Sequence, residues 1–203
     1  MKEFKKIDIS KMSKIYRLNL INSITGYKSA NLIGTKTNEQ INNVAVFSSV
    51  IHLGSDPALI GFILRPTTVP RHTYENIHKY GFFTLNQISE THIKSAHQSS
   101  AKYSKETSEF NEIGLGFEFR NNIEAPFVKD SPIQIGCKYV NEYKIKENNT
   151  IFIIGSIESV YINKTLLMKD GWIQLDKGKV VAINGLDGYS LPKLIKRFSY
   201  AKP

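Results

Sequence analysis

Residues 65–86 read RPTTVPRHTYENIHKYGFFTLN, which places arginines and threonines around the start of a short helix that an apolar strand follows. The first four N–H groups of a helix have no partner within the helix, and the helix dipole adds about half a positive charge at that end. An anion is therefore stabilised there before any side chain contributes. Guanidinium and hydroxyl groups can donate further hydrogen bonds to a phosphate, and this stretch supplies several: Arg65, Thr67, Thr68, Arg71 and Thr73.

The spacing of apolar residues predicts that this helix covers residues 70–80. Tyr74, Ile77 and Tyr80 lie three positions apart on one face, and Gly81 occupies the position of a left-handed C-cap. No Ser/Thr-x-x-Glu box marks its beginning, so the proline at position 70 is the main start signal. A second interpretation stays open, in which the two arginines are ordinary surface residues and the threonines only cap the helix.

Strand signals outnumber helix signals along the chain. Stretches rich in Ile, Val, Phe or Tyr occur at residues 28–36, 44–53, 58–64, 82–88, 133–145, 151–162 and 172–183. The segment Glu147-Asn148-Asn149 predicts a hairpin turn, because Asn tolerates a positive φ. Two further helices are expected over residues 89–102 and 104–112, and a loop over residues 121–132. Together these elements predict an all-β barrel or sandwich.

Composition and charge fit a globular protein of one domain. The 203 residues are 41% hydrophobic and 22% charged, which is enough for one substantial core. The net charge of +9 raises nucleic acid as a partner, but the lysines are dispersed or lie near the ends, without a Lys/Arg-rich run. The N-terminus lacks the apolar core of a signal peptide, and no apolar stretch approaches the ~18 residues of a membrane helix. We therefore expect a cytoplasmic protein that does not bind membranes, and nucleic acid is a weak candidate partner.

Other chemical sites have little support in the sequence. Cys137 is the single cysteine and falls on the apolar side of an alternating segment, which favours a buried hydrophobe over a reactive thiol. His92 and His97 are five apart, whereas histidines that share a zinc ion on one helix stand four apart, so we expect no metal site. Ser48 and Ser49 lie outside any Gly-x-Ser-x-Gly setting, which argues against a hydrolase nucleophile.

Four motifs follow one another along the chain. They are Asn43 and Ser48 with four residues between them, the turn Ser55-Asp56-Pro57-Ala58-Leu59, the run from Thr73 and Ile77 through Gly81 and Phe83 to Asn86, and a closing segment made of Gly185-Leu186-Asp187-Gly188-Tyr189 and Arg197-Phe198-Ser199-Tyr200. In this order, over roughly residues 20–200, they resemble the flavin reductase-like family, whose members bind FMN on a split β-barrel. Two positions depart from the family pattern: Ala58 replaces a second proline, and His72 stands where many members carry a lysine. The second departure leaves open which positively charged side chain contacts the phosphate.

The resemblance implies a mainly β fold over residues 1–203, an antiparallel, Greek-key-like FMN-binding split β-barrel with a few flanking helices. It places the flavin ring along residues 44–49 and the phosphate at the helix start, near the interface of a homodimer that residues 191–200 help to form. The implied cofactor-binding residues are Val46, Phe47, Ser48 and Ser49 along the ring, Arg65, Thr67, Thr68, Arg71, His72 and Thr73 at the phosphate, Asn86 at the end of its motif, and Tyr189, Arg197 and Tyr200 from either subunit.

A flavin also explains why the sequence shows no acid–base constellation, since flavin N5 accepts a hydride directly. The resemblance implies an FMN-dependent NAD(P)H:flavin or NAD(P)H:acceptor oxidoreductase, with NADH or NADPH as donor and a small molecule or flavin as substrate. We expect no catalytic acid or base. Two alternatives stay open: an FMN-binding electron-transfer flavoprotein that serves protein partners and has no NAD(P)H site of its own, and a basic β-barrel module that binds nucleic acid.

Overall fold

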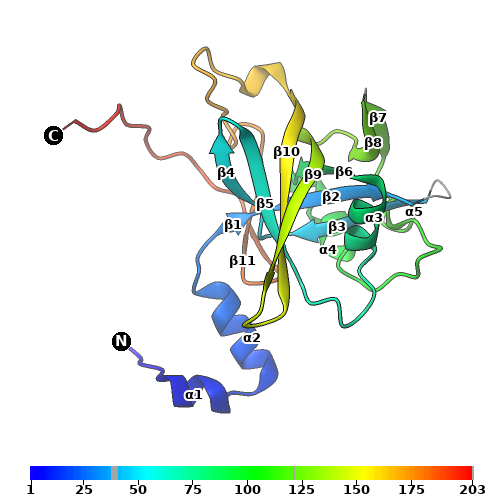
Figure 1. The fold of residues 1–203 in the computed structure, drawn as a ribbon. Coiled ribbons are helices and arrows are strands. Elements are labelled where there is room, and N and C mark those ends of the chain that lie inside the picture. Colours follow the sequence, from blue (N-terminus) through cyan, green and yellow to red (C-terminus); the bar gives the residue numbers. More distant parts are fainter. Residues whose placement is uncertain (38–40, 121, 203) are drawn as a thin grey trace.

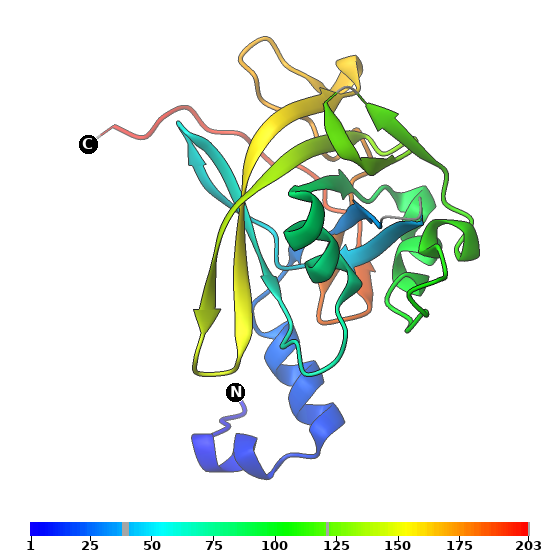
Figure 2. The same cartoon turned by 45° about the vertical axis from the view of Figure 1, so that its right-hand side comes forward.

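The computed structural model describes residues 1–37, 41–120 and 122–202, and its centre is a seven-stranded antiparallel sheet (Figure 1). From edge to edge the strands are β3 (Asn42–Phe47), β2 (Asn31–Lys36), β6 (Phe82–Gln87), β9 (Ile133–Ile145), β10 (Thr150–Ile162), β5 (Ala58–Leu64) and β4 (Ile51–Ser55). Figure 2 shows the long β9–β10 hairpin crossing the molecule. Its turn has the conformation expected from the sequence, with Asn149 at φ 58°.

The sheet must curl until its two edges come together. β3 and β4 lie at opposite ends of the strand order, yet only residues 48–50 connect them. The Cα steps from Phe47 to Ile51 span at most about 15 Å, so the edges are neighbours in space. Ser49 anchors the connection, because its hydroxyl donates to the carbonyl of Ile63 at 2.9 Å and accepts from the N–H of Ile63 at 3.1 Å. The expectation of one continuous strand over residues 44–53 is therefore wrong at this bend.

The expectation of a loop over residues 121–132 is also wrong for most of its length; Asn121 itself lies outside the described residues. β8 (Ile123–Val128) pairs with β7 (Phe117–Arg120) and is buried against β2 and β6. Pro126 has no N–H to donate, but β8 has a single strand partner among the described residues, so a missing donor is tolerated on its other edge. The Pro126 carbonyl oxygen accepts from the Thr84 hydroxyl at 2.6 Å. The approach is so close that a β-carbon at Gly34 would overlap the Pro126 carbonyl oxygen.

A third small sheet forms near the C-terminus from β1 (Lys28–Ser29), β11 (Ala182–Asn184) and β12 (Gly188–Ser190), in the order β1-β11-β12. The strand expected over residues 172–183 is wrong except at its end. Residues 175–179 form a turn in which the Val180 N–H donates to the Leu175 carbonyl at 3.0 Å. The sequence Asp176-Lys177-Gly178 within this turn is polar and flexible, which outweighs the apolar residues on either side.

Helices are short and lie outside the sheet. α3 (His72–Tyr80) begins two residues later than expected and ends, as expected, at Gly81 with φ 74°. The expected helices over residues 89–102 and 104–112 are reduced to shorter pieces: η1 (Glu90–His92), α4 (Ile93–Gln98) and α5 (Glu109–Glu112). The structure also contains η2 (Lys164–Leu166) and two N-terminal helices that the sequence analysis did not predict, α1 (Lys6–Lys11) and α2 (Lys14–Ser23).

The interior of the curled sheet is an aromatic and aliphatic core. Phe62 is fully buried and meets Phe47 and Phe83 edge to face, with ring centroids 5.2 and 5.6 Å apart. Cys137 lies in the same cluster and is fully buried, as the sequence predicts, and burial raises the pKa of its thiol. A second cluster, which includes Val44 and Phe110, joins β3 to α5.

Candidate functional site

The start of α3 presents free backbone donors to its surroundings. Arg71 is the N-cap residue in an extended conformation, and its own side chain does not cap the helix. The Glu75 N–H donates to the Arg71 carbonyl at 3.0 Å, which leaves the N–H groups of the preceding helical residues, 72–74, without an acceptor inside the helix. This end of α3 is therefore suited to an anion.

Side-chain donors gather on the loop that leads from β5 into α3. Arg65 follows the last residue of β5 and is exposed, as are Thr67 and Thr68, and none of the hydrogen bonds among described residues engages these three side chains. The half-buried Arg71 folds back on the loop, where its Nε donates to the Pro66 carbonyl at 3.2 Å. Arg65, Thr67, Thr68 and Arg71 thus lie on the loop that leads to the open end of α3, and their binding to a phosphate stays a prediction.

His72 and Thr73 face different surroundings. His72 is half-buried and lies near the carboxylates of Glu75, Glu106 and Glu109. It contributes to lowering the pKa of Glu75 and Glu106, and it opposes the burial that raises the pKa of Glu109. Thr73 is buried, and its hydroxyl donates to Asn43 Oδ1 at 3.1 Å rather than to the loop. Thr73 therefore fixes the first turn of α3 to β3, and it is the backbone N–H of this residue that remains available to a ligand.

A cluster around Asn43 underlies the start of α3. The Asn43 Oδ1 also accepts from the Thr35 hydroxyl at 3.1 Å, and its Nδ2 donates to Glu109 Oε1 at 2.6 Å. Asn76, one helical turn beyond Thr73, donates to the Thr35 hydroxyl at 3.0 Å. These five side chains are buried, so α3 is joined to β2, β3 and α5 by a polar network inside the protein.

A second set of contacts holds another face of α3 against β9. Glu142 accepts from the Tyr74 hydroxyl at 3.1 Å and pairs with His78 Nε2 at 2.8 Å. Burial, and then this carboxylate, raise the pKa of Tyr74. Because two faces of α3 are tied to the rest of the fold, the direction of its open N–H groups is fixed before any ligand binds.

The residues implied for the flavin ring lie where β3 ends and the sheet closes. Val46, Phe47, Ser48 and Ser49 are all half-buried. Val46 packs on the cluster that includes Val44, whereas Phe47 packs on Phe62. The segment from Asn43, which contacts Thr73 of α3, to Ser48 is about 16 Å long at the rise of an extended strand. A ligand that binds both regions would therefore lie along β3.

Asn86 does not reach this surface. It is fully buried, and its Nδ2 donates to the Leu32 carbonyl at 3.1 Å and to the Thr84 hydroxyl at 2.9 Å, while its Oδ1 accepts from the Val128 N–H at 3.0 Å. The side chain joins β2, β6 and β8. Within one chain, the polar atoms of the Asn86 side chain therefore hydrogen-bond inside the protein and not to a ligand at this surface.

The C-terminal residues that the resemblance implies make their contacts elsewhere among the described residues. Tyr189 packs on the same cluster as Val46, and its buried hydroxyl has no hydrogen-bond partner among the described residues. Arg197 pairs with Asp170 at 2.7 Å and lies over the ring of Trp172, 4.8 Å from its centroid. Tyr200 is exposed on a tail without secondary structure, which projects from the body (Figure 1).

Sequence reasoning missed Glu109 and Glu142, two acidic residues that shape this site. The chain has 18 acidic residues, and no local pattern distinguishes the buried Glu109 from an exposed neighbour such as Glu112. Their roles follow from contacts with residues 66 and 64 or more positions away in sequence. The described residues contain no group of His, Cys, Asp and Glu that could hold a metal ion, and none of their helices is long and apolar enough to cross a membrane.

Comparison with known proteins shows close similarity over the whole chain. The family described as "Flavin reductase like domain" matches residues 27–174. A solved structure from Shewanella frigidimarina NCIMB 400 is 41% identical with a TM-score of 0.95, covering 99% of this chain and 100% of that one; its name gives flavin reductase as a provisional activity and a split barrel as its domain. The mainly β, split-barrel fold expected from the sequence is thereby confirmed.

More distant solved structures share the fold. Nitrilotriacetate monooxygenase component B from Bacillus cereus is 18% identical with a TM-score of 0.84, covering 98% of each chain. An FMN-binding protein from Thermus thermophilus is 14% identical with a TM-score of 0.72, covering 86% of this chain and 91% of that one.

Proposed function

The chain belongs to the flavin reductase-like domain family, and from this premise we propose that it is an FMN-dependent oxidoreductase whose electron donor is NADH or NADPH. The observation that supports the proposal most directly is the open start of α3, with free N–H groups and the unengaged side chains of Arg65, Thr67 and Thr68 around it. An FMN-binding protein of the same fold supports the identity of the cofactor.

The residues present fit the phosphate of FMN. A phosphate accepts several hydrogen bonds at once, and the first turn of α3 offers N–H groups that no helical carbonyl uses. Arg65 and Thr67 can close around it from the loop without breaking a hydrogen bond among described residues. Arg71 adds positive charge while its Nε holds the loop at Pro66.

The ring would lie along the end of β3, where half-buried residues 46–49 supply an apolar surface and backbone groups. When bound, FMN supplies hydride transfer at N5. The chain binds and orients the cofactor. We assign no catalytic acid or base, because hydride transfer to N5 requires none.

We expect FMN to stay with the protein during purification and Arg65→Ala and Arg71→Ala each to weaken FMN binding by about 1.5–3 kcal/mol, the range for hydrogen bonds to a charged group. Riboflavin, which lacks the phosphate, should lose much less affinity. Fluorescence titration with both ligands measures this, and Lys146→Ala, at an exposed lysine of the β9–β10 hairpin, is the matched control for loss of positive charge. Equal losses for FMN and riboflavin would show that the arginines do not bind the phosphate.

The reaction itself is tested by anaerobic titration of the FMN-loaded protein. NADH or NADPH should bleach the flavin absorbance to the same extent as a chemical reductant, and the more effective nucleotide identifies the donor. A flavin that dithionite bleaches but neither nucleotide does would contradict a reductase and favour an electron-transfer flavoprotein that depends on protein partners.

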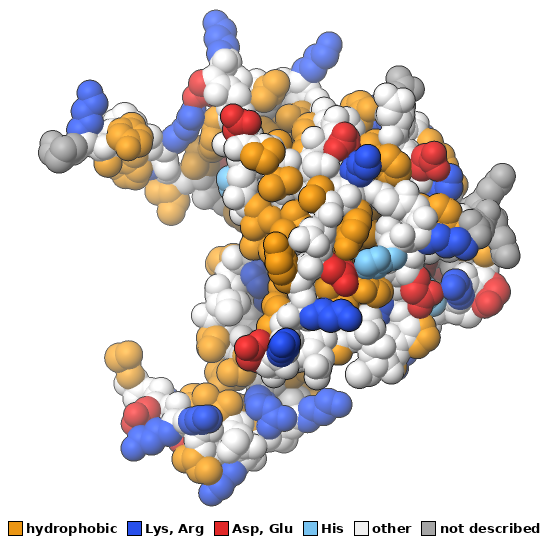
Figure 3. Space-filling view, viewed as in Figure 1, with side chains coloured by type: hydrophobic (Ala, Val, Ile, Leu, Met, Phe, Trp, Pro, Cys, Tyr) orange, Lys and Arg blue, Asp and Glu red, His pale blue; other side chains and the backbone are white. Residues whose placement is uncertain are grey.

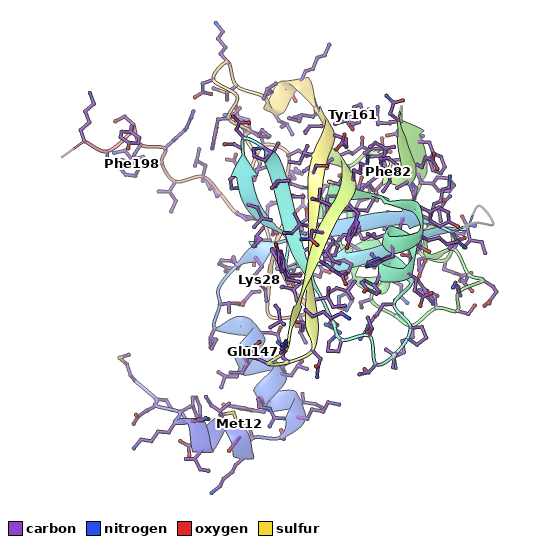
Figure 4. The ribbon with its side chains drawn as sticks, viewed as in Figure 1. Met12, Lys28, Phe82, Glu147, Tyr161 and Phe198 are labelled. Carbon is purple, nitrogen blue, oxygen red and sulfur yellow. The ribbon has the colours of Figure 1, made fainter. Side chains whose placement is uncertain are left out.

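We further propose that the protein is a homodimer. α1 and α2 contain no buried residue. Ile15 on α2 and Ile24, which follows its end, are exposed, as are Ile195 and Phe198 on the C-terminal tail. Figure 3 shows the N-terminal helices and the tail projecting from the same side of the body with a hollow between them, and Figure 4 shows Met12 and Phe198 far from the core. A second copy can cover both segments at once, because a two-fold interface uses each patch twice.

The N-terminal arm, residues 1–27 with α1 and α2, is fixed where it joins the body of the protein, which makes this arrangement specific. Lys28 Nζ donates to the carbonyls of Asn22 at 2.8 Å and Gly185 at 3.0 Å, so the end of α2 is joined to the turn between β11 and β12. Tyr189, on β12, lies beside this junction in sequence. A partner that binds the arm and the tail would therefore be close to the residues expected to approach the flavin from either subunit.

Light scattering at micromolar concentration should give the mass of two 23.0 kDa chains, with an interface on the order of 2,000 Å² or more. Ile15→Glu and Ile195→Glu should shift the protein toward one chain, because a charge buried at the interface is unpaired. Tyr143→Glu, at an exposed residue of β9 outside both segments, should leave the mass unchanged. A flavin-loaded wild type with the mass of one chain would rule out the dimer.

A further inference from the structure

Glu109 is a buried carboxyl group directly beneath the start of α3. It is 6% exposed, Oε1 accepts from Asn43 Nδ2 at 2.6 Å, and Oε2 has no hydrogen-bond partner among the described residues. Burial raises the pKa of this carboxyl, while its own N–H, the Asn43 amide, the nearby His72 and the Val44 N–H act in the opposite direction. Burying such a group costs stability unless a specific contact compensates, and here the principal contact is Asn43.

The Glu109 carboxylate fixes the orientation of the Asn43 amide. A carboxylate can only accept hydrogen bonds, so it selects the Nδ2 side of the amide and turns Oδ1 toward Thr35 and Thr73. An amide in the opposite orientation would place a donor opposite both hydroxyls and its oxygen opposite the carboxylate. The ordered chain of bonds therefore runs from Glu109 through Asn43 to the hydroxyl of Thr73.

Thr73 belongs to the first turn of α3, which carries the open N–H groups. Its hydroxyl is the closest polar link from these N–H groups to the buried network, and Asn76 adds a second link one turn later. The α5 helix that carries Glu109 is itself tied to β3, since the Ser108 hydroxyl donates to the Asn42 carbonyl at 2.9 Å. The network thus sets the position of the helix start from inside the protein.

We propose that Glu109 is a positioning residue for the phosphate of FMN, acting through Asn43 to hold the first turn of α3 with its N–H groups directed at the ligand. This inference rests on the proposed binding of FMN at α3. Glu109 does not touch the ligand in this arrangement. Its effect is on how well the protein distinguishes FMN from riboflavin, since the two differ by the phosphate alone.

The test compares the affinities of FMN and riboflavin for the full-length protein and its variants. Glu109→Leu removes the acceptor of Asn43 Nδ2, and we expect FMN affinity to fall about tenfold, within the range of coupling between contacting residues, while riboflavin affinity changes less than about twofold. Glu109→Gln retains an accepting oxygen and should restore most of the FMN affinity. Glu112→Leu, the same substitution at an exposed position of α5, is the control and should change neither affinity.

Asn43→Ala keeps the test decisive if Glu109→Leu folds poorly. It leaves the Thr73 hydroxyl in place without its acceptor, so FMN affinity should fall; if that hydroxyl instead bound phosphate directly, FMN affinity would hold or rise. In the double variant, Glu109→Leu should add less than about twofold to the effect of Asn43→Ala, because both act along one path.

Three results would overturn the proposal: equal changes for FMN and riboflavin in Glu109→Leu, no change in either, or an undiminished effect of Glu109→Leu in the Asn43→Ala background. A wild type that binds FMN no better than riboflavin would instead show that the phosphate site proposed at α3 is wrong. The two failures are therefore distinguishable.

Discussion

The contact between Asn43 on β3 and Thr73 on α3 determines the geometry of the proposed cofactor site. It joins the strand expected to lie beside the flavin ring to the helix expected to bind the phosphate, and both side chains are buried. The Glu142 contacts to Tyr74 and His78 fix another face of the same helix. A helix held on two faces does not need to be ordered by its ligand, so less of the binding free energy is lost to ordering.

The fold places this junction at the closing edge of the curled sheet. Residues 48–50 connect the two edge strands, and Ser49 fixes that connection to Ile63. β8 fills the space below β2 and β6, where Gly34 and Asn86 allow and secure the close approach. β3 therefore has a supported inner face, while its end and the start of α3 remain at the surface. The terminal segments extend beyond this body, where a second chain can cover their apolar side chains (Figure 3).

The parts of the structure that local chemistry decides were predictable from the sequence. The C-cap at Gly81, the turn at Asn149 and the burial of Cys137 follow from residue type and alternation, and the gathering of Arg65, Thr67, Thr68 and Arg71 follows from their nearness along the chain. The wrong predictions concern elements whose structure depends on contacts between residues far apart in the sequence. β8 contains Pro126, and its burial beneath Gly34 is visible only once β2 and β6 are placed. The helix α2 was not predicted from the sequence, although Ile15, Leu18, Ile21 and Ile24 stand three apart, the spacing that predicts α3; none of the residues of α2 is buried.

Amide hydrogen exchange across residues 66–80 tests the account most directly. If α3 is held by Asn43 and Glu142 before any ligand binds, its amides should already be protected in the flavin-free protein. FMN should slow exchange further at residues 72–74, and riboflavin should not, because only the phosphate reaches the open N–H groups. Rapid exchange throughout α3 without ligand, or equal protection by FMN and riboflavin, would contradict a preformed phosphate site.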